Sequence, residues 1–118
     1  MIVDDDAAIT LVLRQILEDQ GHDVKTARDG TDGYWSYLLF KPVLVITDIQ
    51  MPECDGIELM RHIRVHDPLI KAIYMSGDLN RFRSNLEEER RKYDADLLAK
   101  PFSSVELMRL LPLPQGGA

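Results

Sequence analysis

The chain has 118 residues, of which 45% are hydrophobic and 29% charged, a balance typical of a globular domain with one hydrophobic core. Its 14 basic and 20 acidic residues give a formal net charge of -6, which disfavours binding to nucleic acid or to an anionic membrane. No apolar run approaches the roughly 18 residues of a membrane span, and the single cysteine, Cys54, excludes a disulfide framework, so we expect a cytoplasmic domain.

Short apolar runs along the chain have the composition of buried strands. They lie at residues 1–3, 43–46, 70–75 and 97–99, and a short edge strand is predicted at 24–27. The run at 43–46 is apolar throughout and does not alternate, which is typical of a central parallel strand covered on both faces. The runs therefore predict a sheet with helices on its two sides.

The first three segments between these runs have helical spacing. In the first, apolar residues recur at i, i+3, i+4, i+7 and i+8 and predict one apolar helix face: Ile9, Val12, Leu13, Ile16 and Leu17. A second helix is predicted over residues 31–40, before Pro42. Its Trp35 and Tyr37 are expected at the edge of the core, with an interface as the alternative. Asp55 is a suitable N-cap for a third helix, which ends before Pro68.

The last two predicted helices differ in character. The fourth, at about residues 80–93, is mostly charged, and we expect it to pack shallowly with its charges paired on a solvated face. Its apolar anchors are Phe82, Leu86 and Tyr93. Ser103 and Glu106 form a capping-box pattern that opens a fifth helix, which ends before Pro112.

The alternation of strands and helices predicts the fold class. Short connections imply right-handed crossovers and a single doubly wound, five-stranded parallel sheet with helices on both faces, an α/β fold. We expect one domain at residues 1–111, followed by a tail or the start of a linker at 112–118. In such sheets the ligand crevice lies at the carboxyl ends of the strands, so functional residues are expected there.

Acidic, hydroxyl and basic residues follow four of the predicted strands: Asp4, Asp5, Asp6, Asp48, Ser76 and Lys100. Carboxylates from two adjacent strands repel, so keeping them ionised near neutral pH requires a cation. Hard oxygen ligands with room for water and phosphate favour Mg²⁺. Beside such an ion Asp48 can attack a phosphoryl group, while Ser76 and Lys100 contact the phosphoryl oxygens.

The stretch VITDIQMPECDGIEL at residues 45–59 resembles the D-x-x-M-P-x-x-D-G-x-x-L signature of response-regulator receiver domains in bacterial two-component signalling. The match extends over nearly the whole chain. It implies that the sheet is flavodoxin-like with strand order 2-1-3-4-5 and that Asp48 is the phosphorylation site. It also implies that the domain is a signalling switch and not an enzyme. Its own residues would nevertheless catalyse the phosphorylation of Asp48 and the slow hydrolysis of the aspartyl phosphate.

The same resemblance implies roles for the other residues at the strand ends. Asp5 is expected to bind Mg²⁺ directly, Asp4 to support it, and the backbone carbonyl of Gln50 to be a third ligand beside Asp48. Ser76 in Met75-Ser76-Gly77 corresponds to the hydroxyl switch residue and Lys100 to the phosphoryl-contacting lysine. The implied partner is a sensor histidine kinase or a histidine phosphotransfer protein, and a homodimer is also compatible with the resemblance.

Two features bear on how such a switch works. Receiver domains usually have Tyr or Phe three residues before the lysine, where this chain has Leu97, so the aromatic half of the switch is missing. The surface expected to respond is formed by the last two helices and the fifth strand. The side chains of Gln50 and Asp78 flank the site in the family pattern and are expected to tune the access of water.

Two alternative functions follow from the same residues. A pseudo-receiver would keep the fold and signal by docking alone, which the residue at position 97 favours and the complete set of acidic, hydroxyl and lysine residues disfavours. Asp4-Asp5-Asp6 also contains the Asp-x-Asp of haloacid-dehalogenase-like phosphatases, in which Asp4 would be the nucleophile. Against that class, Ala7-Ala8 lacks the expected hydroxyl residue and the chain has no room for a cap domain.

Overall fold

Strands and helices alternate along the computed structural model of the chain, which describes residues 1–112. The strands are β1 (Ile2–Val3), β2 (Thr26–Ala27), β3 (Leu44–Asp48), β4 (Lys71–Ser76) and β5 (Ala95–Ala99). The helices are α1 (Ala7–Asp19), α2 (Gly30–Phe40), α3 (Gly56–His66), α4 (Arg83–Lys92) and α5 (Ser104–Leu110), with a short 3-10 helix, η1 (Leu79–Phe82), before α4.

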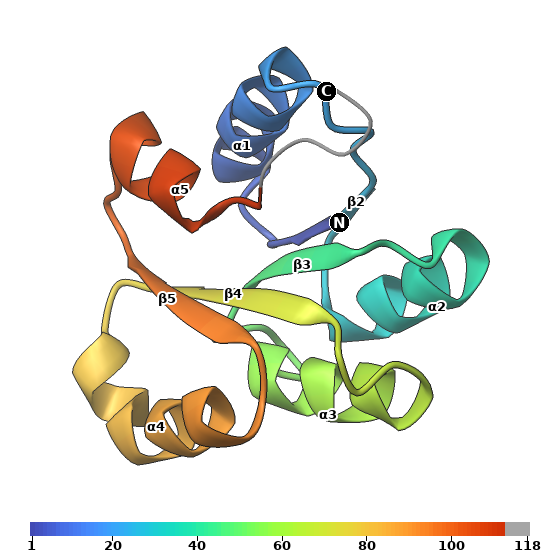
Figure 1. Cartoon of the computed structure of the whole chain (residues 1–118), viewed down its shortest axis with the longest axis vertical. Coiled ribbons are helices and arrows are strands. Elements are labelled where there is room, and N and C mark those ends of the chain that lie inside the picture. Colours follow the sequence, from blue (N-terminus) through green and yellow to red (C-terminus); the bar gives the residue numbers. More distant parts are fainter. Residues whose placement is uncertain (113–118) are drawn as a thin grey trace.

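The five strands form one sheet in the order β2-β1-β3-β4-β5, and all neighbouring strands are parallel (Figure 1). Val3 pairs with Thr47, and Asp48 pairs with Met75. Because β1 and β3 are neighbours and run in the same direction, the residues that follow Val3 reach the edge of the sheet at which Asp48 ends β3. The predicted fold class and strand order are confirmed.

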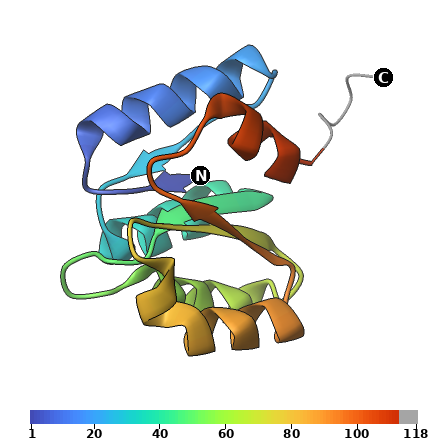
Figure 2. The ribbon, with the colours of Figure 1, turned by 90° about the vertical axis from the view of Figure 1, so that its left-hand side faces the viewer.

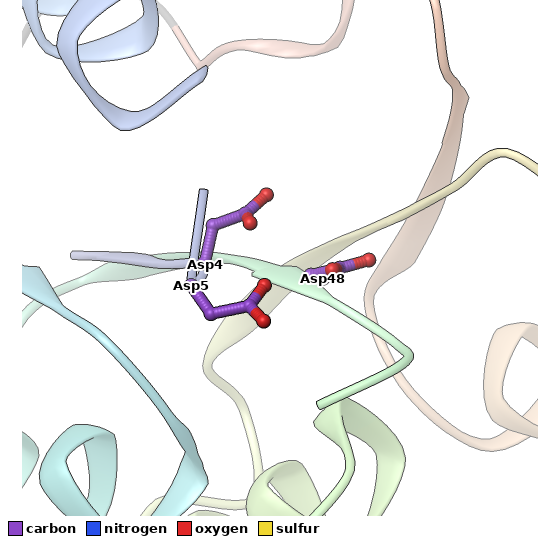
Figure 3. A group of neighbouring side chains, drawn as sticks. All are labelled: Asp4, Asp5 and Asp48. Carbon is purple, nitrogen blue, oxygen red and sulfur yellow. The ribbon is translucent and has the colours of Figure 1, made fainter. Parts of the chain in front are cut away.

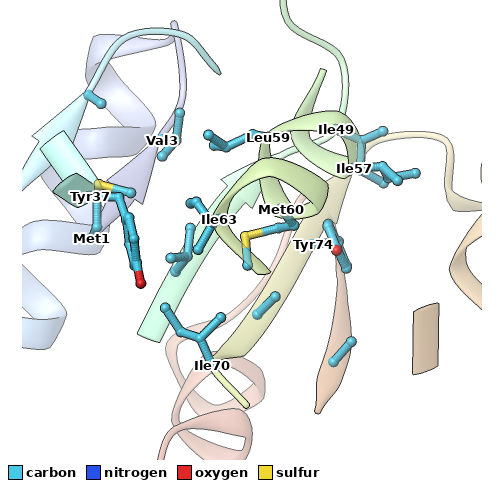
Figure 4. Close-up of a cluster of buried hydrophobic side chains, with 14 of the residues drawn as sticks. Met1, Val3, Tyr37, Ile49, Ile57, Leu59, Met60, Ile63, Ile70 and Tyr74 are labelled. Atoms are coloured by element: carbon cyan, nitrogen blue, oxygen red, sulfur yellow. The ribbon is translucent and has the colours of Figure 1, made fainter. Parts of the chain in front are cut away.

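Helices cover both faces of the sheet. Figure 2 shows α1 and α5 on one side and α4 on the other, and α2 and α3 share the side of α4. Strand residues alternate between the two cores: Val45 and Tyr74 face α2, α3 and α4, whereas Ile46 and Met75 face α1 and α5. Figure 4 shows the larger cluster, in which α3 packs on the central strands. Every residue of β3 is buried, as expected for a central parallel strand.

The fourth helix departs from the prediction at its start. The segment after β4 forms the 3-10 helix η1 first, because the Asp78 side chain accepts a hydrogen bond from the Arg81 N–H (3.3 Å) and tightens the turn. The α-helix proper begins only at Arg83 and has no side-chain cap. Leu86 is its buried residue, in agreement with the predicted shallow packing.

The prediction that Trp35 lies at the edge of the core is wrong, because its exposed fraction is 61%. Helix α2 packs through Gly33 and Tyr37, which lie one turn apart, and a Cβ at Gly33 would come within 3.1 Å of Leu59 on α3. Residues two positions further along point to the opposite side of a helix. Trp35 and Leu39 therefore face solvent.

The predictions for the C-terminal part of the chain can be compared with the structure up to residue 112. Ser103 and Glu106 form the predicted capping box of α5, and Leu111 is the C-cap. Residues 113–118 of the predicted tail lie outside the described residues, so the domain boundary stays a prediction. No helix in the described range combines the length and apolar character that crossing a membrane requires.

Candidate functional site

Three carboxylates meet at the carboxyl ends of β1 and β3. Asp4 and Asp5 follow β1, Asp48 is the last residue of β3, and one oxygen of each lies within 4.8 Å of the others. Figure 3 shows the three side chains side by side at these strand ends. Asp4 and Asp48 are buried, whereas Asp5 is exposed. The parallel pairing of β1 with β3 produces this cluster, and it leaves the Asp5 side open to solvent.

The third aspartate of the N-terminal run has a separate structural role. Its carboxylate is the N-cap of α1 and accepts hydrogen bonds from the Ala8 and Ile9 N–H groups (2.9 and 3.4 Å). The Asp6 backbone N–H in turn donates to Asp4 Oδ1 (2.9 Å), which helps to fix Asp4. Asp6 therefore supports the cluster without joining it.

The Lys100 ammonium completes the charged cluster from β5. Its Nζ lies 2.9 Å from Asp4 Oδ2 and 3.5 Å from Asp48 Oδ2. Burial disfavours the ammonium, but its hydrogen bond to Asp4 and the attraction of Asp48 outweigh that cost and raise the pKa of Lys100. The structure thus brings Lys100 against both buried carboxylates, although Asp4 lies 96 residues away from it in sequence.

Ser76 and Gln50 lie close to Asp48 in register and in sequence: Ser76 follows Met75, which pairs with Asp48, and Gln50 is two residues after Asp48. Ser76 ends β4 and is buried; its Oγ accepts a hydrogen bond from the Asp78 N–H (2.9 Å), and its carbonyl accepts one from the Lys100 N–H (2.9 Å). The second of these bonds ties the end of β4 to the end of β5, and the first fixes the Ser76 hydroxyl to the turn that follows β4. The Gln50 side chain is exposed two residues after Asp48, and the metal-binding role of its carbonyl stays a prediction.

The charge state of Asp48 is set by competing effects. Burial raises the pKa of its carboxyl, the Lys100 ammonium lowers it, and the neighbouring Asp4 and Asp5 carboxylates raise it again; the net change is upward. An added cation between these carboxylates would favour their ionised forms. The donor set consists of hard oxygen atoms, and one of them is on an exposed side chain, so the cluster could hold a hard divalent ion with water or phosphate on its open side.

The loop after Asp48 approaches the acceptor strand closely. A Cβ at Gly56 would collide with the carbonyl oxygen of Asp48, and the Gly56 N–H donates to the Ile49 carbonyl (2.9 Å). Asp55 caps α3 by accepting a hydrogen bond from the Glu58 N–H (2.8 Å). The Asp-Gly pair of the sequence motif is therefore explained by a helix cap followed by a position without room for a side chain.

An apolar groove adjoins the charged cluster between the start of α1 and the segment after β5. It is lined by Ala8, Ile9, Val12, Lys100, Pro101 and Phe102. Val12 was predicted on the apolar face of α1, yet 53% of it is exposed here. The groove therefore offers an unfilled apolar surface that begins at the lysine of the site.

A largely buried polar network was not predicted from the sequence. Arg64, Tyr74 and Glu89 are hydrogen-bonded to one another, although Glu89 belongs to the helix whose charges were predicted to be solvated. The exposed pairs Glu88–Lys92 and Arg83–Glu87 on that helix do follow the prediction. The available signal was Tyr74, because a phenol in an apolar buried strand needs a hydrogen-bond partner.

Comparison with known proteins gives one consistent result. Relatives include the alkaline phosphatase synthesis transcriptional regulatory protein PhoP of Bacillus subtilis, which is 31% identical over 107 residues covering 91% of this chain and 44% of that protein. Response regulator MprA of Mycobacterium avium is 30% identical over 111 residues, covering 92% of this chain and 46% of that protein. The chain thus spans less than half the length of these relatives.

Solved structures agree with the sequence relatives. The receiver domain of NtrX from Brucella abortus superposes with a TM-score of 0.79 at 26% identity, covering 92% of this chain and 91% of that one. A receiver domain protein from Clostridium thermocellum gives 0.78 at 26% identity, with 92% and 86% covered. The family model for the response regulator receiver domain matches residues 1–111 of this chain. The predicted resemblance is confirmed, and the chain belongs to the response regulator receiver domain family.

Proposed function

We propose that Asp48 accepts a phosphoryl group from the phosphohistidine of a sensor histidine kinase or a histidine phosphotransfer protein. The observation that carries this proposal is the meeting of three carboxylates within 4.8 Å beside the Lys100 ammonium. Asp5 and Asp48 would hold Mg²⁺ together with the Gln50 carbonyl, and Asp4 would support them. When bound, the ion would offset negative charge on the phosphoryl oxygens.

The chemical step uses the ionised Asp48. One carboxylate oxygen attacks phosphorus, the bond between phosphorus and the donor's imidazole nitrogen breaks, and its electron pair stays on that nitrogen. Lys100 lies 3.5 Å from the Asp48 carboxylate, so its ammonium can contact an oxygen of the phosphoryl group attached there. The buried Ser76 hydroxyl at the adjacent strand end would donate to another oxygen.

Removal of the phosphoryl group would reverse the switch. Water would attack the aspartyl phosphate and restore the Asp48 carboxylate. The exposed side chains of Gln50 and Asp78 border the site and would tune the approach of that water. Equal dephosphorylation rates in wild type, Gln50→Ala and Asp78→Ala proteins would contradict this tuning role.

The apolar groove would receive the phosphodonor protein. It begins at Lys100 and continues over Val12 and Phe102, so a helix seated there would carry its histidine toward Asp48. Val12→Asp should lower the rate of phosphotransfer from a histidine-phosphorylated donor at least tenfold while leaving the rate with the small donor acetyl phosphate unchanged. Leu39→Asp, on the exposed face of α2, is the matched control and should change neither rate.

The central test is acetyl phosphate with Mg²⁺, followed by mass spectrometry of the intact protein and its peptides. A phosphoryl group stable over minutes on Asp48, absent from Asp48→Asn, is the expected result. Asp55→Asn keeps an aspartate-like cap seven residues away and should label as wild type does. Turnover that requires Asp4 alone would indicate the phosphatase alternative, and no reaction would indicate a pseudo-receiver.

A further inference from the structure

A network of three side chains, two of them buried and Glu89 partly buried, joins α3, β4 and α4. Arg64 Nη1 donates to Glu89 Oε1 (2.8 Å) and to the Tyr74 hydroxyl (3.1 Å), and that hydroxyl donates to Glu89 Oε1 (2.7 Å). Arg64 is 6% exposed and Tyr74 is fully buried. Figure 4 shows Tyr74 inside the cluster beneath α3. We call Arg64, Tyr74 and Glu89 the Arg64 network.

The Arg64 network is the main polar attachment of α4. Within residues 83–92 only Leu86 is buried, and the other charged side chains of the helix that form ion pairs do so at its surface. Tyr93, just after the helix, lies over the Arg64 guanidinium, with 4.1 Å between its ring centroid and Cζ. Loss of the network would therefore leave α4 held chiefly by one leucine.

The network also lies on the path from the proposed phosphorylation site. Tyr74 and Ser76 are two residues apart on β4, so their side chains project from the same face of the sheet. Tyr74 is paired with Leu97 on β5, the position where an aromatic side chain was expected. A movement of Ser76 toward a phosphoryl group would act on β4 two residues from Tyr74, whose hydroxyl is bonded to Glu89 of α4.

The hydrogen bonding of the network is incomplete. Arg64 Nε and Nη2 are buried without hydrogen-bond partners among the described residues. Buried unpaired donors cost stability, and apolar replacements of buried ion pairs are often equally stable, so stability alone does not explain these residues. Buried ion pairs can instead fix one arrangement of the elements that they join.

From this geometry we propose that the Arg64 network holds α4 in register with β4 and relays a change at Ser76 to the α4 surface. The relay rests on the proposed function, because it requires modification of Asp48. Tyr74, Arg64 and Glu89 act here as positioning residues. They touch neither the phosphoryl group nor the carboxylates of the site.

The first experiment measures amide hydrogen exchange of α4 in the unmodified protein. Tyr74→Phe and Glu89→Gln should each speed exchange of the α4 amides by about tenfold, because each removes hydrogen bonds to a charged group, while the α1 amides stay unchanged. Glu88→Gln is the matched control, since it breaks an exposed pair on the same helix and should change exchange by less than about twofold. Equal α4 exchange in the wild type and both network variants would overturn the holding role.

The second experiment adds beryllofluoride and Mg²⁺, a mimic of aspartyl phosphate, and repeats the measurement. In the wild type, α4 exchange should change on binding, and in Tyr74→Phe at least half of that change should be lost. The amount bound, measured by fluorine NMR, and the urea midpoint of each variant show whether the loss reflects binding or global stability. An α4 response of full size in Tyr74→Phe, or none in a wild type that binds the mimic, would overturn the relay.

The two experiments separate this inference from the proposed function. A wild type that binds no beryllofluoride would refute the phosphoacceptor function and with it the relay, while the exchange of unmodified α4 still decides the holding role. The triple variant Arg64→Met, Tyr74→Phe and Glu89→Leu adds a further check. It removes all three polar groups together, so it should fold with an apolar contact in place of the network, and it should lose the α4 response to the mimic.

Discussion

Gly56 and Asp48 meet at a point where the backbone leaves no space. The absence of a side chain at Gly56 lets the start of α3 pass directly over the acceptor strand, and this contact holds the last peptide of β3 in place. At Gly77, which follows Ser76, a Cβ would have no atoms within 4 Å. A side chain therefore has space at Gly77 and none at Gly56, although both glycines lie close to site residues.

Gly56→Ala should lower the free energy of unfolding by about 1–3 kcal/mol, because the new methyl group forces the loop away from the Asp48 carbonyl. Gly77→Ala should stay within about 0.5 kcal/mol of the wild type, since the position is open. Urea unfolding followed by circular dichroism measures both. A Gly56→Ala protein as stable as Gly77→Ala would show that the loop relaxes freely.

The raised pKa of Asp48 makes stability depend on pH in a defined direction. Because burial raises the pKa, the folded protein binds this proton more tightly than the unfolded chain, and the ionised carboxylate costs stability at neutral pH. In EDTA at pH 7, Asp48→Asn should therefore be more stable than wild type. The difference should shrink as the pH falls through the Asp48 pKa and vanish below the ordinary aspartate range, as urea midpoints at pH 7, 5 and 3 would show.

At the scale of single elements, α3 illustrates how a motif residue can be structural. Asp55 accepts the Glu58 N–H at the start of the helix and lies outside the carboxylate cluster. Asp55→Ala should cost about 0.5–2 kcal/mol of stability, whereas Asp55→Asn, which keeps an accepting oxygen, should cost far less. Thermal unfolding of the two variants measures the difference, and equal melting temperatures would mean that the cap contributes nothing.

The elements that sequence predicts best are those with one dominant cause. Strand β3 was predicted because its apolar run had to be buried on both faces, and the Asp55 cap and the α5 capping box follow from local hydrogen bonding. The solvent exposure of the Trp35 side chain depends on how α2 packs against α3 through Gly33, which is a tertiary contact. A hydrophobic pattern within one helix does not contain that information.

The same limit applies to the candidate site. Asp4, Asp5, Asp48 and Lys100 could be placed together because the parallel topology brings strand ends to one edge of the sheet. The pairing of Lys100 with Asp4 at 2.9 Å was not predicted, since it depends on how far the ammonium reaches into the cluster. Glu89 was predicted to be solvated, and its pairing could not be read from the α4 sequence because its partner Arg64 lies on another helix, 25 residues away.

At the scale of the whole molecule, ion binding couples to folding through the carboxylate cluster. At ten times its dissociation constant, Mg²⁺ should raise the free energy of unfolding by about 1.4 kcal/mol, because the ligands come together only in the folded chain. Asp5→Asn should abolish most of this gain, and the exposed Asp23→Asn, outside the cluster, should keep it. Thermal unfolding with and without MgCl₂ measures the effect; an equal gain in all three proteins would locate the ion elsewhere.

The position of Trp35 has a practical consequence for optical spectroscopy. As the only indole of the chain, and mostly in contact with water, it should emit in the native protein much as it does in a denatured one. The tryptophan emission should therefore change little when the protein unfolds. The same fluorophore becomes a selective reporter for any molecule that covers the outer side of α2, because such a complex would move its emission to shorter wavelength.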